Sequence, residues 1–402
     1  MGYKKQVPEG VQDYLAAQCY NKRIIEGKIR QRFLLCGYDE IETPMFEYCD
    51  VFANGIGSIR QEKMIKFFDQ QGRILALRPD ITMPIARVAA TKLADFPQRL
   101  FYIGNAFGYD NSIHGVQKEF TQAGVECIGI PGVAADAEMI ALAIQSLLDA
   151  GLDNFQIDIG QVEFFKGLME EADLDREESE ALREALDRKD MLGMELVLRD
   201  KPVSLNLKER IMQLAMLYGG EEVLSKAYAF SAHPRCRSAV AHLKRVYALL
   251  ESFALSRYVS IDFGMIKSID YYTGVIFRGI TDDLGYPLLA GGRYDTLMGS
   301  FGREACAIGF AIGIKRVLVA LQRQGRLSEL PLLDAVVGGA SESDVFRHME
   351  RLRAEKKRVA SALGLDANAL AQYACGRARQ ALYVDEQGCA TIYAPRQKET
   401  EG

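Results

Sequence analysis

The chain has 402 residues, and 49% of them are apolar, so it is long enough for two or three domains with a sizeable buried core. Its formal net charge of −5 argues against a general nucleic-acid binder, which normally carries a basic excess, although a local basic patch is still open. No run of about 18 apolar residues is present and the N-terminus lacks an apolar segment, so we expect a cytoplasmic protein without a signal peptide or a membrane span.

Helices and short strands are predicted to alternate through residues 1–150. A long helix is expected over residues 13–36, because Gly37 is well placed as its C-terminal stop. Residues 38–44 alternate polar and apolar types up to a proline, which favours a strand. The elements expected next are a β-hairpin at 65–77 that turns at 69–72, a helix at 82–93, strands at 99–107 and 120–128, and a helix at 136–150.

The character of the chain changes at about residue 161 and changes back at about residue 256. Charged residues dominate the first part of this stretch, and Leu and Met recur at helical spacing around residues 211–216, so we expect a helical insertion over 161–256. The elements expected after it are strands at 259–263, 274–278 and 287–290 and a final helix at 309–323. Together these elements make up a first domain over residues 1–325.

A small separate unit is predicted over residues 326–402. The elements expected in it are a strand at 333–337, a helix at 342–363, and a pair of strands at 381–384 and 390–393 joined by the turn 385–388. A chain of this length suits a small α/β domain, although such a domain is marginally stable alone.

Sequence motifs that would indicate a nucleotide, a nucleophile or a metal are absent. There is no G-x-x-x-x-G-K-[ST], no G-x-G-x-x-G after a strand and no G-x-S-x-G, and the pair Gly55 and Gly57 is a weak candidate for a phosphate loop. The four histidines lack metal-ligand spacing, and the eight cysteines show neither C-x-x-C spacing nor a Cys/His cluster. We therefore expect reduced thiols, no cofactor and no metal.

The first candidate binding residues are Asp80 and Thr82, in the segment Leu-Arg-Pro-Asp-Ile-Thr. They stand at a predicted strand-to-helix junction, where Asp and Thr are good helix-capping residues, so capping alone explains them. A carboxylate is also a strong partner for an ammonium group in a partly dry pocket. Both interpretations stay open at this stage.

The second pair is Gln122 and Glu126 on the predicted strand 120–128. Residues four apart on a strand point to the same face, so the two side chains are neighbours. A solvated strand face is one interpretation. The other is a buried site, because Phe120 and Val125 are apolar and a buried carboxylate is a natural partner for an imidazole N–H.

Two further segments carry candidate site residues. Lys267 opens a stretch that continues to Tyr271 and Tyr272, and such a tyrosine pair either packs in a core or lines an aromatic pocket. Residues 307–316 are apolar and end at Lys315 and Arg316, as an everyday core helix would.

Taken in order over about residues 6–323, these segments resemble the motifs of class II histidyl-tRNA synthetases. The resemblance implies an α+β fold with an antiparallel sheet flanked by helices, and dimers that form through the region 38–44. It also implies roles for the matching residues. Asp80 and Thr82 would hold the α-amino group of histidine, Gln122 and Glu126 would face the amino group and the imidazole, and Tyr271 and Tyr272 would line the imidazole pocket.

Two departures from the synthetase pattern concern the chemistry of activation. The family's strand ends in Phe-Arg-x-Glu, whose arginine grips the α-phosphate of ATP, whereas this chain has Phe107-Gly108-Tyr109-Asp110. Lys267 replaces a second arginine; it keeps the charge, loses the bidentate fork, and can still pair with a ligand carboxylate. Losing one such donor typically costs about 2.7–4 kcal/mol of transition-state stabilisation, so we expect no catalysis.

The spellings Leu-Arg-Pro-Asp-x-Thr and Ser-x-Asp-Tyr-Tyr-Thr-Gly resemble most closely those of ATP phosphoribosyltransferase regulatory subunits. This resemblance implies a non-catalytic, allosteric subunit in histidine biosynthesis that binds histidine as a feedback sensor. It further implies a homodimer that joins a short-form catalytic subunit in a hetero-octamer, with no tRNA and no membrane as partner. Two alternatives are a histidyl-tRNA synthetase-like enzyme with an altered ATP site and a scaffold protein whose pocket binds nothing.

Overall fold

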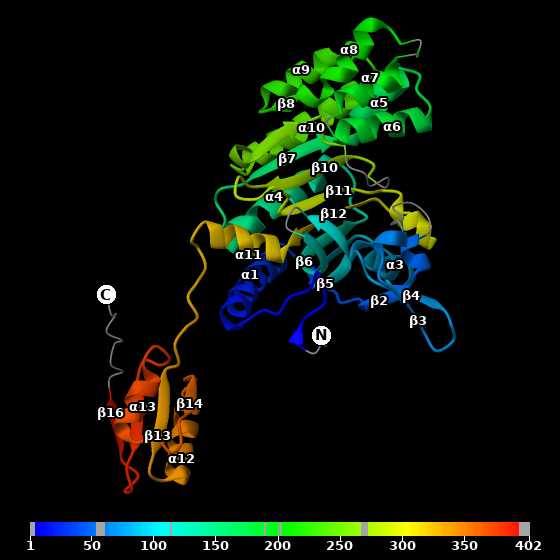
Figure 1. The fold of residues 1–402 in the computed structure, drawn as a ribbon. Coiled ribbons are helices and arrows are strands. Elements are labelled where there is room, and N and C mark those ends of the chain that lie inside the picture. The colour runs from blue at the N-terminus through cyan, green and yellow to red at the C-terminus, as the bar shows by residue number, and fades with distance from the viewer. Residues whose placement is uncertain are drawn as a thin grey trace. The chain divides into compact units, whose positions relative to one another are not determined.

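Two units make up the structure, a computed structural model that describes residues 5–53, 61–112, 115–188, 190–199, 201, 203–266 and 272–393. The first unit spans Met1–Leu327 and the second spans Ser328–Gly402 (Figure 1).

The first unit is built on a sheet of nine strands in the order β1-β5-β6-β12-β11-β10-β7-β9-β8. The strands are β1 Asp39–Glu40, β5 Gln98–Ser112, β6 Gly115–Ile128, β7 Gln156–Gln161, β8 Tyr218–Gly219, β9 Val259–Asp262, β10 Val275–Ile280, β11 Leu289–Arg293 and β12 Ala307–Gly313. Neighbouring strands are antiparallel except in the pairs β1–β5 and β7–β9, which are parallel. The predicted α+β fold with a mainly antiparallel sheet is therefore confirmed.

Side chains that alternate along the central strands build two cores, one on each face of the sheet. Phe101 and Val125 belong to the core on the face covered by helices α1 (Ala16–Leu35), α4 (Val133–Ala150) and α11 (Ile314–Arg323). Leu100 and Tyr102 belong to the other core, beside the helices α2 (Asp50–Ala53) and α3 (Thr82–Lys92). The two-residue period of a strand explains this division.

A separate three-stranded sheet, β2-β4-β3, adjoins α3. Its strands are β2 Phe46–Tyr48, β3 Lys66–Phe68 and β4 Ile74–Leu77. The hairpin predicted over 65–77 is confirmed, because β3 pairs with β4 in an antiparallel register and Gly72 at the turn has a positive φ of 78°.

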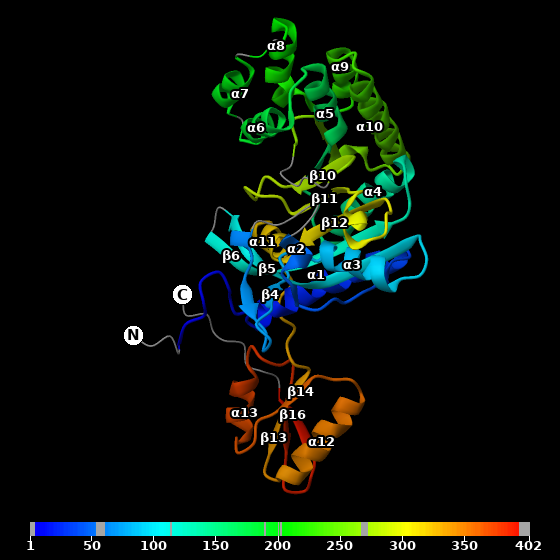
Figure 2. The ribbon, with the colours of Figure 1, turned by 90° about the vertical axis from the view of Figure 1, so that its right-hand side faces the viewer.

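The predicted helical insertion lies between β7 and β9, at the β8 end of the large sheet (Figure 1). Its helices are α5 Val162–Glu171, α6 Arg176–Asp187, α7 Met191–Leu198, α8 Leu205–Gln213, α9 Glu222–Phe230 and α10 Pro234–Ser252. Figure 2 shows α6, α7 and α8 in one group and α5, α9 and α10 in another. Short 3-10 helices lie at Gln61–Lys63, Leu214–Met216, Ser256–Tyr258 and Leu297–Phe301.

Two predictions for the first unit were wrong. Residues 309–313 belong to strand β12, and the helix expected at 309–323 begins only at Ile314. Because β12 lies between two strands and is covered on both faces, its apolar run has no period that separates strand from helix. The strand expected over 38–44 is only two residues long, Asp39–Glu40.

The shortened strand has a physical cause in Arg78, which is 4% exposed. Its Nη1 donates to the carbonyl oxygen of Thr43 at 2.6 Å, and its Nε donates to the carbonyl oxygen of Asn105 at 2.7 Å. The backbone near Thr43 therefore bonds to a side chain in place of a neighbouring strand.

The second unit is a four-stranded sheet, β14-β13-β15-β16, with one helix packed on each face. Its elements are β13 Ala335–Gly339, α12 Glu342–Ala354, β14 Val359–Ser361, α13 Ala367–Ala374, β15 Ala381–Val384 and β16 Ala390–Tyr393. The strand pair predicted at 381–384 and 390–393 is confirmed. The helix predicted over 342–363 is wrong beyond Ala354, because Lys356 takes a left-handed φ of 61° and strand β14 follows. Among the helices of both units that the structure describes, none is long and apolar enough to cross a membrane.

Candidate functional site

Five of the seven predicted binding residues meet at one cavity of about 190 Å³ above the centre of the large sheet. They are Asp80, Thr82, Gln122, Glu126 and Tyr272. The other two, Lys267 and Tyr271, lie outside the described residues. Strands β6, β11 and β12 and the first turn of α11 supply most of the remaining lining.

Small residues on β12 keep the floor of this cavity open. In the register of β6 and β12, Glu126 lies opposite Gly309 and Gln122 lies opposite Gly313. A methyl group at Gly309 would collide with the Glu126 carboxyl group and would approach the Val125 carbonyl oxygen at 2.5 Å. Gly309 therefore leaves the space that the Glu126 side chain occupies.

Glu126 is the most deeply buried acid of the cavity, at 1% exposure. Its carboxyl group accepts a hydrogen bond from the hydroxyl of Tyr294, which follows β11. The pKa of Glu126 is raised to about 8, chiefly by burial and in small part by the neighbouring Asp80, while the side chains of Tyr294 and Thr82 oppose the shift. Burial therefore favours the protonated form of Glu126.

Asp80 has both of the roles that its position suggested. Its Oδ1 accepts a hydrogen bond from the backbone N–H of Met83 at 3.0 Å, so it caps the first turn of α3. It also lines the cavity, and burial raises the pKa of its carboxyl group. Thr82, at 8% exposure, also lines the cavity, and its side chain opposes the rise in the pKa of both Asp80 and Glu126.

The two acids at this end of the cavity have no positive partner within the described part of the chain. Neither Asp80 nor Glu126 forms an ion pair with any residue that the structure describes. Two carboxyl groups that share a poorly solvated site favour a cationic ligand, because a positive charge lets both ionise.

The opposite end of the cavity is cationic. Lys315 and Arg316 enter it from the first turn of α11. Arg316 donates from Nη1 to the carbonyl oxygen of Pro287 at 2.7 Å, and its guanidinium lies over the ring of Tyr286. Lys315 has no ion pair within the described ranges, and burial lowers its pKa. The cavity thus has one acidic end and one basic end.

The side-chain amide oxygen of Gln122 is a further candidate for contact with a ligand. Its Oε1 is buried without a hydrogen-bond partner in the described part of the chain. Buried side-chain polar atoms are nearly always paired, so an unpaired one beside a cavity points to a bound molecule or water.

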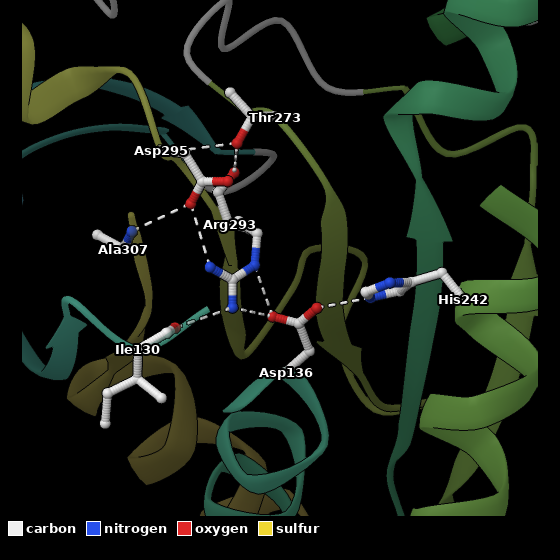
Figure 3. Close-up of polar contacts among 7 residues, drawn as sticks. All are labelled: Ile130, Asp136, His242, Thr273, Arg293, Asp295 and Ala307. Atoms are coloured by element: carbon white, nitrogen blue, oxygen red, sulfur yellow. Dashed lines mark hydrogen bonds and ion pairs between the residues drawn. The ribbon is translucent and has the colours of Figure 1, made fainter. Parts of the chain in front are cut away.

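A polar network that centres on Arg293 includes the residues next to the cavity tyrosines (Figure 3). Arg293 ends β11, is 6% exposed, and pairs with Asp136 of α4 through Nε at 2.8 Å. Thr273 follows Tyr272 and Asp295 follows Tyr294, and the backbone N–H of Asp295 donates to Thr273 Oγ1 at 3.0 Å.

Sequence reasoning missed Tyr294, Tyr102 and the cavity position of Lys315. Tyr294 stood in the segment Gly-Gly-Arg-Tyr-Asp, whose paired glycines are a signal for close approach that was not used. Tyr102 is 2% exposed, and burial, together with the nearby Glu126 and Asp80, keeps its pKa far above the ordinary value. No local pattern distinguishes it from a core tyrosine.

Gly108 replaces the arginine of the synthetase motif. It lies in β5 where the register with β6 shifts, between Phe107 and Asp110. A methyl group there would lie 3.4 Å from the Lys63 carbonyl oxygen and 3.8 Å from Pro79 Cβ, which are ordinary contact distances. Crowding at Cβ therefore does not demand a glycine. The described residues also contain no group of three or more His, Cys, Asp or Glu side chains that could hold a metal ion.

Comparisons with known proteins identify the family of the chain. Residues 10–317 match a family model described as histidyl-tRNA synthetase. An ATP phosphoribosyltransferase regulatory subunit of Acetivibrio thermocellus is 49% identical over 355 residues, which cover 87% of this chain and 85% of that protein.

Solved structures give the same result. A crystal structure of an ATP phosphoribosyltransferase regulatory subunit/histidyl-tRNA synthetase from Bacillus halodurans matches with a TM-score of 0.82 and 32% identity, over 96% of this chain and 98% of that one. A histidyl-tRNA synthetase from Nostoc matches with a TM-score of 0.79 over 97% of this chain and 96% of that one, but at 18% identity it supports the fold alone. The identity and coverage of these relatives show that this chain belongs to the family of ATP phosphoribosyltransferase regulatory subunits, which is built on the histidyl-tRNA synthetase fold.

Proposed function

We propose that the cavity binds free histidine and that the chain is a non-catalytic regulatory subunit of ATP phosphoribosyltransferase, the first enzyme of histidine biosynthesis. The observation that carries this proposal is the pair of acids that line the cavity, the half-buried Asp80 and the buried Glu126, which have no cationic partner among the described residues. In this role the subunit reports the level of the pathway's end product to a catalytic partner.

The two ends of the cavity suit the charges of histidine. Asp80 and Thr82 take the α-ammonium group through charge-assisted hydrogen bonds. Glu126, already bonded to Tyr294, takes an imidazole N–H, and the ring packs against Tyr272. Gln122 supplies its free oxygen, and Lys315 faces the carboxylate at the basic end. Lys267 and Tyr271 complete the set of ligand residues.

Catalysis is not part of this proposal. Gly108 stands where the synthetases have the arginine that grips the α-phosphate of ATP. Lys267 stands where they have the second arginine that takes part in activation. Loss of a single preorganised donor costs about 2.7–4 kcal/mol, or 10²–10³ in rate, so the adenylation of histidine would be negligible.

The partner is a short-form ATP phosphoribosyltransferase catalytic subunit, which meets dimers of this chain in a cytoplasmic hetero-octamer. The name of the relatives, regulatory subunit, supports such a catalytic partner. Histidine regulates the complex only if it binds two arrangements of the subunits unequally, and a coupling of about 1–3 kcal/mol is sufficient for useful feedback.

The test is co-purification of this chain with a short-form catalytic subunit, followed by measurement of phosphoribosyltransferase activity with and without histidine. We expect a stable complex whose activity falls when histidine is added. A complex that forms but whose activity does not change with histidine would support the other alternative, a scaffold protein whose pocket binds nothing.

The alternative enzyme, a histidyl-tRNA synthetase with an altered ATP site, is favoured by one feature, the retention of Arg316 at the basic end. Histidine-dependent exchange of pyrophosphate into ATP separates the two functions. We expect no exchange above background, and robust exchange would reverse the assignment.

A further inference from the structure

We propose that His242 is a positioning residue that couples the helical insertion to the ligand cavity through Asp136 and Arg293. The inference concerns the histidine site, and in that respect it rests on the proposed function. Its structural half, the link between α10 and the cavity tyrosines, is independent of which ligand the cavity takes.

The link begins at Asp136 in the first turn of α4, whose side chain is fully buried. Its Oδ1 accepts hydrogen bonds from Arg293, from Nε at 2.8 Å and from Nη2 at 2.5 Å, while its Oδ2 lies 2.6 Å from His242 Nε2 (Figure 3). An ionised carboxylate only accepts, so Nε2 of His242 carries the hydrogen of this bond. One oxygen of the Asp136 carboxylate therefore bonds to the central sheet, and the other bonds to the insertion.

The link continues from Arg293 to the residues that flank the two tyrosines. Arg293 donates from Nη1 to Asp295 Oδ1 at 3.1 Å, and the same oxygen accepts the backbone N–H of Ala307 at 3.1 Å. The backbone N–H of Thr273 donates to the carbonyl oxygen of Arg293 at 2.8 Å. Tyr294 is thereby held on both sides, and Tyr272 is held through its neighbour Thr273.

The two tyrosines carry the link into the cavity. The hydroxyl of Tyr294 donates to Glu126. The ring of Tyr272 lies against Gly292, where an added methyl group would come within 2.7 Å of its Cε1. A shift of Arg293 therefore moves one tyrosine that bonds to an acid of the site and one that forms its wall.

His242 stands at the other end, in α10, the last helix of the insertion. This helix packs against α5 and α9 of the insertion and also against α4. A movement of the insertion displaces the Nε2–H group of His242 relative to Asp136. The Asp136 carboxylate then shifts, and Arg293 shifts with it. Linkage requires the reverse as well: a ligand that fixes Tyr294 and Tyr272 also stabilises α10.

The first test is calorimetric titration of the full chain with histidine. His242→Ala should weaken histidine binding roughly 2- to 30-fold, the range found for residues that couple separated sites. His242→Gln should restore most of the affinity, because its amide N–H can donate to Asp136. The matched control is Lys244→Ala on the exposed side of the same helix, which should change nothing. If His242→Ala lowers the melting temperature but binds histidine as the wild type does, His242 is merely structural and the proposal is wrong.

The second test is hydrogen exchange of the same proteins. In the ligand-free chain, His242→Ala should speed exchange at the amides of Thr273 and Tyr294, and Lys244→Ala should not. In the wild type, histidine should slow exchange in α10. Absence of both effects would overturn the coupling. A wild type that binds no histidine would instead overturn the proposed function, and the ligand-free comparison would still decide the coupling.

Discussion

The carboxyl group of Glu126 occupies the space that a side chain at Gly309 would fill. The two residues lie opposite each other on neighbouring strands, and a methyl group at Gly309 would collide with the carboxyl oxygen. An acid can be buried in the middle of this sheet only because its neighbour has no side chain. The site therefore depends on Gly309, although a glycine has no side chain with which to contact a ligand.

Gly309→Ala should destabilise the protein by about 1–3 kcal/mol, because the methyl group must displace Glu126 or the backbone of Val125. Thermal unfolding measures this loss. The matched control is Gly27→Ala in helix α1, where an added methyl group meets no atom within 4 Å. That change should stabilise the chain by about 0.5–1 kcal/mol. Equal effects of the two substitutions would contradict the packing described for Gly309.

Stability should fall with rising pH because of Glu126. Its pKa is about 8 in the folded chain and about 4.3 in an unfolded one, so the folded state holds the proton more tightly. The protonated Glu126 contributes its full stabilisation below the unfolded pKa, and this contribution is lost as pH rises through about 8. The free energy of unfolding falls by at most about 1.4 kcal/mol per pH unit in this range. Urea unfolding of the wild type and of Glu126→Gln between these limits measures it. The difference between the two proteins should change with pH, and parallel profiles would show that Glu126 is not protonated in the empty site.

Lys315 should recognise the carboxylate of the ligand. Lys315→Met should lower the affinity for histidine about 10-fold and leave the affinity for histidinol, which lacks the carboxylate, unchanged. Calorimetry with both ligands forms a double-mutant cycle between the side chain and the ligand group. Lys226→Met, at an exposed position of α9, is the control for a general change of charge. Equal losses for the two ligands would assign Lys315 to stability or to another group of the ligand.

Arg78→Met should destabilise the segment 38–44, through which we propose that the chain dimerises. The change leaves the buried carbonyl oxygen of Thr43 and the partly buried one of Asn105 without their donor, and an unsatisfied buried group costs about 1–3 kcal/mol. Sedimentation analysis should show weaker dimers than for the wild type. Arg73→Met, in the exposed hairpin turn, should leave the dimer unchanged. A dimer of wild-type strength in Arg78→Met would place the interface elsewhere.

The parts of the site that could be predicted from the sequence are those in which one short segment fixes the geometry. Gln122 and Glu126 are four apart on a strand, so their shared face follows from the period alone. Asp80 follows a proline before a helix, so its place beside the first turn of α3 also follows from local rules. Residue type then identified them as partners for a charged ligand.

The parts that could not be predicted depend on contacts between distant segments. Tyr294 reaches Glu126 across 168 positions of sequence, and Arg293 reaches Asp136 across 157. Neither pair leaves a periodic pattern. Strand β12 was taken for a helix because both of its faces are buried, which removes the alternation of polar and apolar residues that marks a strand.

Calorimetric titration of the purified chain with histidine in the absence of ATP tests the central claim most directly. We predict saturable binding at one site per chain, and an affinity about 10- to 150-fold lower in Glu126→Gln, which loses a charged hydrogen-bond partner but keeps its shape. Glu304→Gln, at an exposed position, should bind as the wild type does. No binding by the wild type, or equal binding by the wild type and Glu126→Gln, would contradict a histidine sensor at this cavity.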